Sequence, residues 1–290
     1  MKKYLFLILC LFASADFLIH HAEIQSVEIE NKDLQTDVNR LPLSINIIAN
    51  KNGVGWDQDV DVLMSALTGL GHDVAFVKRG EKRQKNVSCR QADVNIFIER
   101  VNKEFFPFAE KNYLLPNAEW LTLSPDEVAQ FDCILCRTKE TERIFKPLNS
   151  NVVFMGFTCM DRLDRDVVKD YQIPLHLAGA SIQKGTDTLI SAWAAHPEFP
   201  SLQLVRHRGK KNISLQANIN LIYEYLPKEE LIALQNRCGL HICPSMTEGF
   251  GYYIFEGLST EAVVVATNAP LLYLTLHESF EGIWIHRFLH

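Results

Sequence analysis

The chain alternates short apolar runs with stretches in which apolar residues recur at the spacing of a helix. The first apolar run covers residues 45–49, and an amphipathic pattern with a period of about 3.6 residues follows it. The residues that make this pattern are Val60, Leu63, Met64, Leu67 and Leu70, with Gly71 at its end. Another apolar run comes at 74–77. A strand, a helix and a second strand in this order predict a βαβ unit, and therefore a parallel sheet.

Further apolar runs extend this series and lead to a polar break. Strands are predicted at 93–98, 131–136 and 151–155. Residues 158–171 are rich in Arg, Lys and Asp and interrupt the alternation. We therefore place a domain boundary there, with residues 43–170 as an N-terminal domain and residues 171–290 as a C-terminal domain.

A second alternation of strands and helices follows the break. Strands are predicted at 174–179, 202–205, 240–244 and 262–266. Helices are predicted at 186–193, 227–238 and 252–258, with Gly239 closing the second of them. Two series of this kind predict an α/β protein with two Rossmann-like domains. In such folds a ligand binds at the carboxyl ends of the strands, here in a cleft between the domains.

The first residues have the pattern of a targeting segment. Lys2 and Lys3 precede an apolar run at 4–12 and a short stretch of small residues. This pattern predicts that residues 1–22 are a secretory signal peptide or a retained membrane anchor, with an apolar N-terminal strand as the alternative. Residues 23–42 are polar and read as a linker. We expect a secretory or membrane-associated protein, with residues 4–19 as the membrane contact, or else a cytoplasmic one.

Composition narrows the class of protein. The 290 residues are 47% hydrophobic and 22% charged, which excludes a disordered, collagen-like or multi-span membrane chain. A net charge of −6 argues against nucleic acid as a partner. Cys133 and Cys136 have the spacing of a metal or redox pair, but their apolar neighbours indicate a buried strand. We predict no metal site.

The strongest chemical motif lies at residues 244–256. Glu248 precedes Gly249 and Gly251, and Glu256 lies in the helix predicted after them. The glycines let the backbone turn sharply and approach a ligand, and the amides that open the helix suit an anion. The two glutamates would be about 12 Å apart on a helix, at 1.5 Å per residue. That span could place one carboxylate on a sugar and the other on the ribose of one nucleotide-sugar.

Two more strand-to-helix turns carry candidate ligand contacts. In 177–185 a strand leads into a helix through Lys184 and a glycine, so that a full positive charge lies where the helix dipole already favours an anion. After the first strand, Gly53 and Gly55 form a glycine loop that either lines the acceptor or phosphate side of a site or only makes the turn. Such a pair of glycines is weak evidence by itself.

Two polar segments have two possible roles, and the histidines are predicted to be structural. Residues 111–113 and 117–120 read either as a loop facing the acceptor or as a packed surface loop. We expect the histidines to have packing or solvent roles. They are His72, His176, His207 and His241.

Residues 244–256 and their surroundings resemble the Glu-x7-Glu element of GT-B glycosyltransferases of the large, retaining, family-four-like class (glycosyl transferases group 1). The resemblance covers residues 45–270. It implies that Glu248 contacts the hydroxyls of the donor hexose, that Glu256 contacts the ribose, and that Lys184 binds the diphosphate. Ser181 and the backbone of Gly249, Phe250 and Gly251 complete the implied donor site. The family usually has an Arg about five residues before the Lys, where this chain has Gly179.

This resemblance implies a transferase that moves a hexose from a nucleotide-sugar to an unknown glycan, lipid or protein acceptor, with retention of configuration. Lys184 and Glu248 would act by position and charge, and neither a metal nor another cofactor would be needed. The missing Arg and the short C-terminus leave a second possibility, a non-catalytic nucleotide-sugar-binding module or an inactive fragment. Because further βα units would be expected after Pro270, we predict an incomplete second domain and a truncated chain. An oxidoreductase is disfavoured, since no Gly-x-Gly-x-x-Gly follows the first strand.

Overall fold

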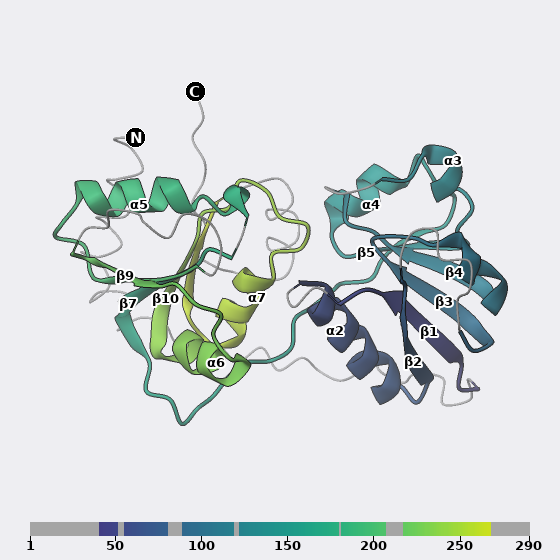
Figure 1. Ribbon diagram of the computed structural model, residues 1–290, viewed down its shortest axis with the longest axis horizontal. Helices are drawn as coiled ribbons and strands as arrows, with labels where there is room; N and C mark the ends of the chain where they lie inside the picture. The colour runs from purple at the N-terminus through teal and green to yellow at the C-terminus, as the bar shows by residue number, and fades with distance from the viewer. Residues whose placement is uncertain are drawn as a thin grey trace, which may run out of the picture.

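The computed structural model describes residues 41–51, 55–80, 89–118, 122–179, 181–206 and 217–267. Within these residues two parallel sheets lie side by side, each in its own unit (Figure 1). The predicted α/β class with two Rossmann-like domains is confirmed. The signal or anchor and nearly all of the linker fall outside the described residues and stay predictions. No helix in the described ranges is long and apolar enough to cross a membrane.

The first sheet has six parallel strands among the described residues, in the order β2-β1-β3-β4-β5-β6. The strands are β1 Ser44–Ala49, β2 Asp73–Lys78, β3 Ala92–Ile98, β4 Ala109–Leu115, β5 Cys133–Cys136 and β6 Val152–Phe154. All of them except β4 coincide with apolar runs in the sequence.

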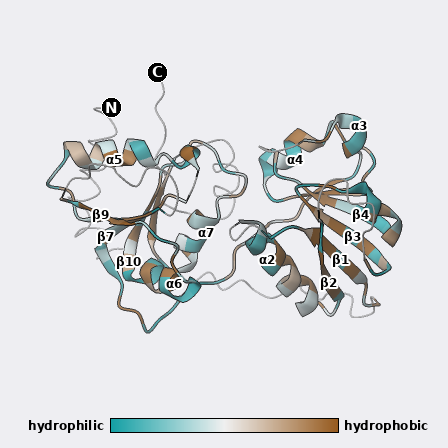
Figure 2. Ribbon diagram, in the orientation of Figure 1, coloured by the Kyte–Doolittle hydropathy of each residue, from teal (hydrophilic) through white to brown (hydrophobic). Residues whose placement is uncertain are grey.

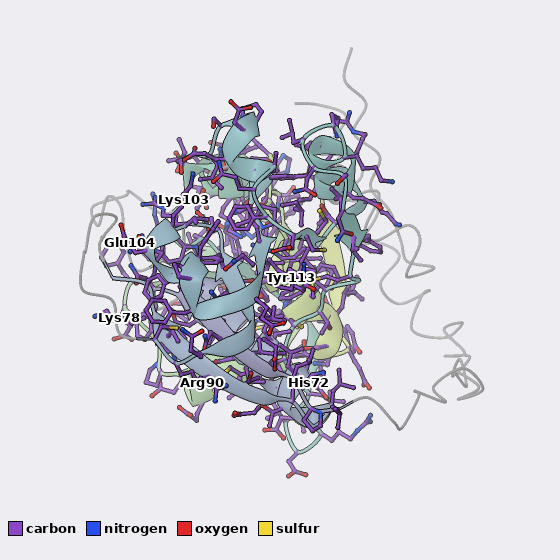
Figure 3. All side chains as sticks on the ribbon, turned by 90° about the vertical axis from the view of Figure 1, so that its right-hand side faces the viewer. His72, Lys78, Arg90, Lys103, Glu104 and Tyr113 are labelled. Atoms are coloured by element: carbon purple, nitrogen blue, oxygen red, sulfur yellow. The ribbon has the colours of Figure 1, made fainter. Side chains whose placement is uncertain are left out.

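The interpretation of residues 111–113 as a loop was wrong, because they lie in the middle of β4. Tyr113 lies near the centre of the view in Figure 3, on this strand. A row of buried amides crosses the sheet here: Asn46 donates to Asn95 and Asn95 donates to Asn112, each at 3.0 Å. Asn112 is therefore an interior residue, and its polarity hid the strand from a pattern based on apolar positions.

Helices cover both faces of the first sheet. They are α2 Gly55–Gly69, the 3₁₀ helix η1 Lys103–Phe108, α3 Pro125–Val128 and α4 Lys139–Phe145. Successive strand residues point to opposite faces, so Ile47 packs with α2 whereas Ile48 packs with η1, α3 and α4. The chain leaves α2 through Gly71 at φ +86°, as predicted for the end of this helix.

The second sheet has five parallel strands in the described part of the chain, in the order β11-β10-β7-β8-β9. The strands are β7 Asp170–Leu177, β8 Leu202–Val205, β9 Ile219–Ile222, β10 Cys238–Cys243 and β11 Val263–Ala266. The helices are η3 Ile182–Lys184, α5 Thr186–Ala195, α6 Lys228–Arg237 and α7 Tyr252–Ser259. The predicted incomplete ending falls on residues 268–290, outside the described residues.

Gly239 does not close a helix, as the sequence suggested, but lies within β10. A Cβ at this position would be 2.7 Å from the Cα of Tyr171, at the start of β7. The glycine is therefore needed for the close approach of two paired strands. The helix before it already ends at Arg237.

Apolar side chains concentrate on the strands of both sheets, as the brown segments in Figure 2 show. Burial on both faces explains why most strands read as continuous apolar runs rather than as alternating ones. The last strand of the first sheet ends at Phe154, and β7 begins at Asp170, immediately before the predicted boundary. The segment between them joins the two units.

The carboxyl ends of the parallel strands in the first sheet lie at one edge of that sheet. In Figure 3, His72 and Arg90, which precede β2 and β3, lie at the bottom, whereas Lys78, the last residue of β2, and Lys103, which follows β3, lie higher in the view. The strand order reverses between β1 and β3 in the first sheet and between β7 and β10 in the second. Ligands of open α/β sheets bind at the carboxyl ends of such strand pairs.

Candidate functional site

Two loops meet at the carboxyl ends of β7 and β10, where the strand order of the second sheet reverses. Gly185 has φ +68°, and a Cβ there would be 2.2 Å from the carbonyl oxygen of Pro244. The amide of Met246 also donates to the carbonyl of Gln183 at 2.8 Å. The loop after β7 and the loop after β10 are thus held together through backbone contacts that only glycine permits at residue 185.

This contact brings Lys184 and Glu248 together. Their side chains form an ion pair, with 2.7 Å between Lys184 Nζ and Glu248 Oε1, and they are 19% and 13% exposed. The ammonium also lies 3.6 Å from the ring centroid of Tyr253. The two residues that the sequence assigned to the diphosphate and to the donor sugar therefore form one polar site.

Ser245 and Tyr253 support this pair, and neither was predicted from the sequence as a site residue. Ser245 Oγ donates to Glu248 Oε1 at 2.5 Å and shares a further short hydrogen bond with the hydroxyl of Tyr253. Burial, with the nearby Cys243 and Glu248, raises the pKa of Tyr253, so the phenol stays protonated. Its position one residue into α7 was visible in the sequence, but nothing there pointed it toward Glu248.

Glu256 lies in a different environment. It is 3% exposed, and its Oε1 lies 2.6 Å from Nη2 of Arg162, while Gln235 donates to its Oε2 at 2.9 Å. Arg162 belongs to the segment that joins the two units. A donor ribose would have to share these carboxylate oxygens with Arg162 and Gln235, and the predicted ribose contact stays a prediction.

The glycines of the motif have distinct positions. Gly251 has φ +91° and begins α7 in the left-handed conformation. A Cβ on Gly249 would be 2.5 Å from Oδ1 of Asn117, which follows β4 in the first unit. One of the two predicted acceptor-side segments thus reaches the donor motif. Ser181, by contrast, is exposed and accepts a hydrogen bond from the amide of Gln183 at the start of η3.

Phe250 joins the two units. Its ring is buried in the core cluster of the first sheet, 5.3 Å from the ring of Phe157 and 4.4 Å, stacked, from that of Phe255. The side chain therefore has a packing role between domains. The donor contact implied for its backbone remains a prediction.

A second cation lies near Lys184, at the end of the neighbouring strand. Arg206 follows β8, and its Nη1 lies 3.9 Å from Oδ1 of Asp187 in the first turn of α5. Burial, with the charges of Lys184 and Arg206, lowers the pKa of His176 to about 4. The neutral imidazole is bonded to Ile242 O and Thr186 Oγ1. A charge is therefore present near the start of α5 although Gly179 replaces the Arg of the resembled family.

Asp59, Arg137 and Tyr252 form a buried polar contact between the units. Arg137 donates from Nη1 to both oxygens of Asp59, at 2.8 and 3.1 Å, and the hydroxyl of Tyr252 donates to Asp59 Oδ1 at 2.7 Å. Burial raises the pKa of Asp59 against the opposing effect of Arg137. In Figure 1, α2 and α7, which carry Asp59 and Tyr252, lie on the facing sides of the units.

The carboxyl edge of the first sheet carries one further carboxylate. Glu99 follows β3 with φ +60°, an uncommon conformation for a residue with a Cβ, and accepts a hydrogen bond from Trp56 Nε1 at 2.5 Å. Burial raises the pKa of Glu99. Gly55 is the first residue of α2, beside Trp56, whereas Gly53 lies outside the described residues.

The cysteines and histidines of the described part form no metal centre. The six described cysteines are free thiols, and Cys133 and Cys136 are buried in β5 as predicted. In the same ranges no group of three or more His, Cys, Asp or Glu residues could hold a metal ion. His241, like His176, is buried, whereas His207 lies outside the described residues.

Neither a protein-family model nor a curated protein matches the chain. Several solved structures match its fold. A sucrose-phosphate synthase from Thermosynechococcus elongatus has a TM-score of 0.62 at 13% identity, over 84% of this chain and 86% of that one. Anabaena Alr3699/HepE in complex with UDP-glucose has a TM-score of 0.57 at 14% identity, over 84% and 85%. An α-glucosyltransferase in complex with UDP and a 13-mer DNA containing an HMU base has 0.53 at 12%, over 78% and 80%.

These similarities confirm the GT-B architecture that the sequence motif implied. At 12 to 14% identity they establish the fold alone. What the site does must therefore be argued from its own geometry.

Proposed function

We propose that this chain, a protein of GT-B architecture, is a glycosyltransferase that uses a nucleotide-sugar donor. The observation that carries the proposal is the Lys184–Glu248 pair at the point where the strand order of the second sheet reverses. A cation for a diphosphate and a carboxylate for sugar hydroxyls lie side by side there. UDP-glucose and UDP in structures of the same fold are consistent with such a donor.

We assign the donor diphosphate to Lys184 and the start of α5. The helix dipole and its first amides favour negative charge, and Lys184 adds a full positive charge. Arg206, near the first turn of α5, supplies a second cation in place of the Arg that Gly179 replaces. Both charges would stabilise the leaving diphosphate, and no metal is needed in this scheme.

We assign the donor sugar to Glu248. A diphosphate that binds Lys184 takes over the partner of this carboxylate, which is then available to the sugar hydroxyls. Ser245 holds the carboxylate in place during this exchange, since it donates to the same oxygen. We also propose that the transferred sugar is a hexose and that the reaction retains the anomeric configuration. Glu256 is proposed to contact the ribose of the donor.

One observation favours the second candidate, a nucleotide-sugar-binding module without turnover. Lys184 and Glu248 neutralise each other at 2.7 Å, so the donor must compete with an existing ion pair. The described residues contain no unpaired carboxylate beside this pair that would serve as a base. Turnover, rather than binding, therefore separates the two candidates.

Nucleic acid is not part of the proposal. The DNA in the α-glucosyltransferase structure belongs to that protein, and the net charge of −6 argues against a similar partner here. This exclusion stays a prediction.

The test uses calorimetric titration of UDP and UDP-glucose with variants of the pair. Lys184→Gln is expected to weaken both ligands about tenfold to a hundredfold, because it removes a charged hydrogen-bond donor. Glu248→Gln is expected to leave UDP binding unchanged or tighter, because it releases Lys184, and to lose the preference for UDP-glucose over UDP. Lys146→Gln, directly after α4, is the matched control, with no expected effect.

Turnover is measured in the same set as release of UDP from UDP-glucose, with water as the acceptor of the glucosyl group. Release by the unaltered chain supports the enzyme, and binding without release supports the module. If a panel of nucleotides and nucleotide-sugars fails to bind, both candidates are rejected.

A further inference from the structure

A cavity of about 320 Å³ lies at the carboxyl edge of the first sheet, apart from the Lys184–Glu248 site. The chain lines it where three strands end, with Asn50 after β1, Arg79 and Gly80 after β2, and Arg100 after β3. Thr122 closes it from the segment that precedes α3. The strand order of the first sheet reverses between β1 and β3, which is where open α/β sheets bind ligands. The volume is at the lower end of the range of small-molecule sites.

Arg79 is the unusual residue of this cavity. It is 8% exposed, yet within the described ranges no carboxylate lies at ion-pair distance from its guanidinium. Arginine is rarely buried to this extent unless it is paired. Burial and the charge of Arg100 both lower the pKa of Arg79, which is the direction expected of a cation that an anion would stabilise.

Arg100 adds a second positive charge at the mouth of the cavity. It is exposed, and its guanidinium lies 5.7 Å from the ring centroid of Trp56, the residue bonded to Glu99. Two arginines in one small cavity repel each other unless something negative lies between them. The part of the lining that the structure describes contains no acidic side chain.

The backbone around Arg79 is fixed by hydrogen bonds. The amide of Arg79 donates to Ala49 O at 2.8 Å, and the Asn50 side chain both accepts from the Gly80 amide at 3.2 Å and donates to Gly80 O at 3.4 Å. Gly80 has φ +71°, so the chain turns away directly after the arginine. The ends of β1 and β2 thus hold Arg79 in place before any ligand arrives, which lowers the ordering cost of binding.

We propose that this cavity binds a phosphate monoester carried by the acceptor, with Arg79 and Arg100 as its cationic ligands. The planar guanidinium donates paired N–H groups that match phosphate oxygens, and two arginines balance the double charge of a monoester. The word acceptor rests on the proposed transferase function, whereas the anion site itself does not. A phosphorylated sugar and a phosphorylated lipid headgroup share this chemistry.

The site is tested by calorimetric titration of inorganic phosphate into the full chain in the presence of saturating UDP, which occupies the donor site. Arg79→Gln and Arg100→Gln are each expected to weaken phosphate binding at least about tenfold. Arg143→Gln on the exposed face of α4 removes the same charge elsewhere and is expected to change it less than about twofold. Because Arg79 is buried, circular dichroism is used to check that the Arg79→Gln variant folds. If it does not fold, Arg100→Gln, at an exposed position, gives an independent result.

Two further arms identify the source of the phosphate. Glucose 6-phosphate is compared with glucose, and phosphatidylcholine vesicles with phosphatidic acid are compared with vesicles without it. Arginine-dependent binding of either phosphorylated probe supports the proposal and names its source. Phosphate binding that is unchanged in both arginine variants, or absent from the unaltered chain, overturns it.

The design also separates this proposal from the transferase function. If UDP does not bind, the phosphate titration is repeated in the Lys184→Gln variant, which removes the lysine of the proposed donor site. If phosphate binding in that variant depends on the arginines, the anion site is supported and the proposed donor site is rejected. If UDP binds but phosphate binding does not depend on the arginines, the donor site is supported and the anion site is rejected.

Discussion

At the scale of single residues, the buried charged side chains of the site form hydrogen bonds or ion pairs with defined partners. Lys184 and Glu248 hold each other, Asp59 is shared by Arg137 and Tyr252, and Glu256 by Arg162 and Gln235. A buried charge without such a partner would cost several kcal/mol. These site charges are therefore compensated inside the protein, whereas Arg79 has no carboxylate at ion-pair distance among the described residues, and the proposed anion site rests on this contrast.

The first prediction concerns the buried histidines. Burial lowers the pKa of both His176 and His241 to about 4, below the value of about 6.5 in an unfolded chain. Between these values the unfolded chain binds more protons than the folded one. The free energy of unfolding should therefore fall as the pH drops from about 6.5 to about 4, by up to about 1.4 kcal/mol per pH unit for each histidine.

Urea unfolding at several pH values checks this prediction. Replacing His176 or His241 with Gln should reduce the slope of stability against pH, whatever its effect on stability at neutral pH. A slope that is identical in the unaltered chain and in both variants would contradict the prediction.

The residues of the site were predictable to different degrees. Glu248 and Lys184 were found because glycines and strand ends surround them in a recognisable order. Ser245 and Tyr253 were not, because a serine after a proline and a tyrosine in an apolar helix look ordinary until the fold brings them to Glu248. The burial of Glu256 was equally invisible, since its partners are 94 and 21 positions away in the sequence, a separation that no local pattern reports.

At the scale of elements, strands that end in the same place create the sites. Most strands were predicted from apolar runs, and β4 was missed because Asn112 occupies an interior position. The short β9 was missed as well, since Asn220 interrupts its apolar run. Gly239 was misread because a helix end and a close strand contact both select glycine, and the sequence does not distinguish them.

The amide row of the first sheet gives a prediction about stability. Asn95→Ala removes the central side chain, so that Asn46 Nδ2 keeps only the carbonyl of Arg90 as an acceptor and Asn112 Oδ1 loses the donor that Asn95 supplies. Because buried polar groups without partners cost about 1 to 3 kcal/mol each, unfolding free energy should fall by about 2 to 4 kcal/mol. Urea unfolding measures this, with Asn151→Ala at the exposed start of β6 as the control. An effect no larger than that of the control would mean that the row is not a structural element.

The contact of Gly185 with Pro244 gives a prediction about binding. Gly185→Ala would place a Cβ 2.2 Å from a carbonyl oxygen at a positive φ, so the two loops must separate. The Lys184–Glu248 pair should be disturbed, and UDP should bind about tenfold more weakly in a calorimetric titration. Gly69→Ala is the matched control, because a Cβ there would meet nothing within 4 Å. Equal UDP affinity in both variants would reject this role of the loop contact.

At the scale of the whole molecule, the donor motif itself joins the two units. Phe250 packs into the core of the first sheet, Gly249 approaches Asn117, and Tyr252 bonds to Asp59. Three of the four positions 249–252 thus contact the first unit, while Glu248, immediately before them, contacts Lys184. The arrangement of the units and the geometry of the Lys184–Glu248 pair are consequently linked.

Tyr252→Phe tests this link. The variant keeps the ring contacts with Phe157 and Phe250 but loses the hydroxyl that donates to Asp59. We expect a larger radius of gyration in small-angle X-ray scattering and UDP release slowed about tenfold, with UDP affinity changed less than about threefold because Lys184 is untouched. Tyr171→Phe, whose hydroxyl lies at the exposed start of β7, is the control. Unchanged scattering and turnover in Tyr252→Phe would show that the bond does not hold the units together.

The ion pair of Lys184 and Glu248 has a consequence for selectivity. Because each side chain already pairs with the other, a diphosphate that binds Lys184 takes the cation away from Glu248, which keeps its hydrogen bond from Ser245. A sugar joined to that diphosphate would bring hydroxyl donors to the same carboxylate. If the site binds the proposed donor, a joined nucleotide-sugar should therefore bind more tightly than free phosphates or free sugars, which then compete poorly for it.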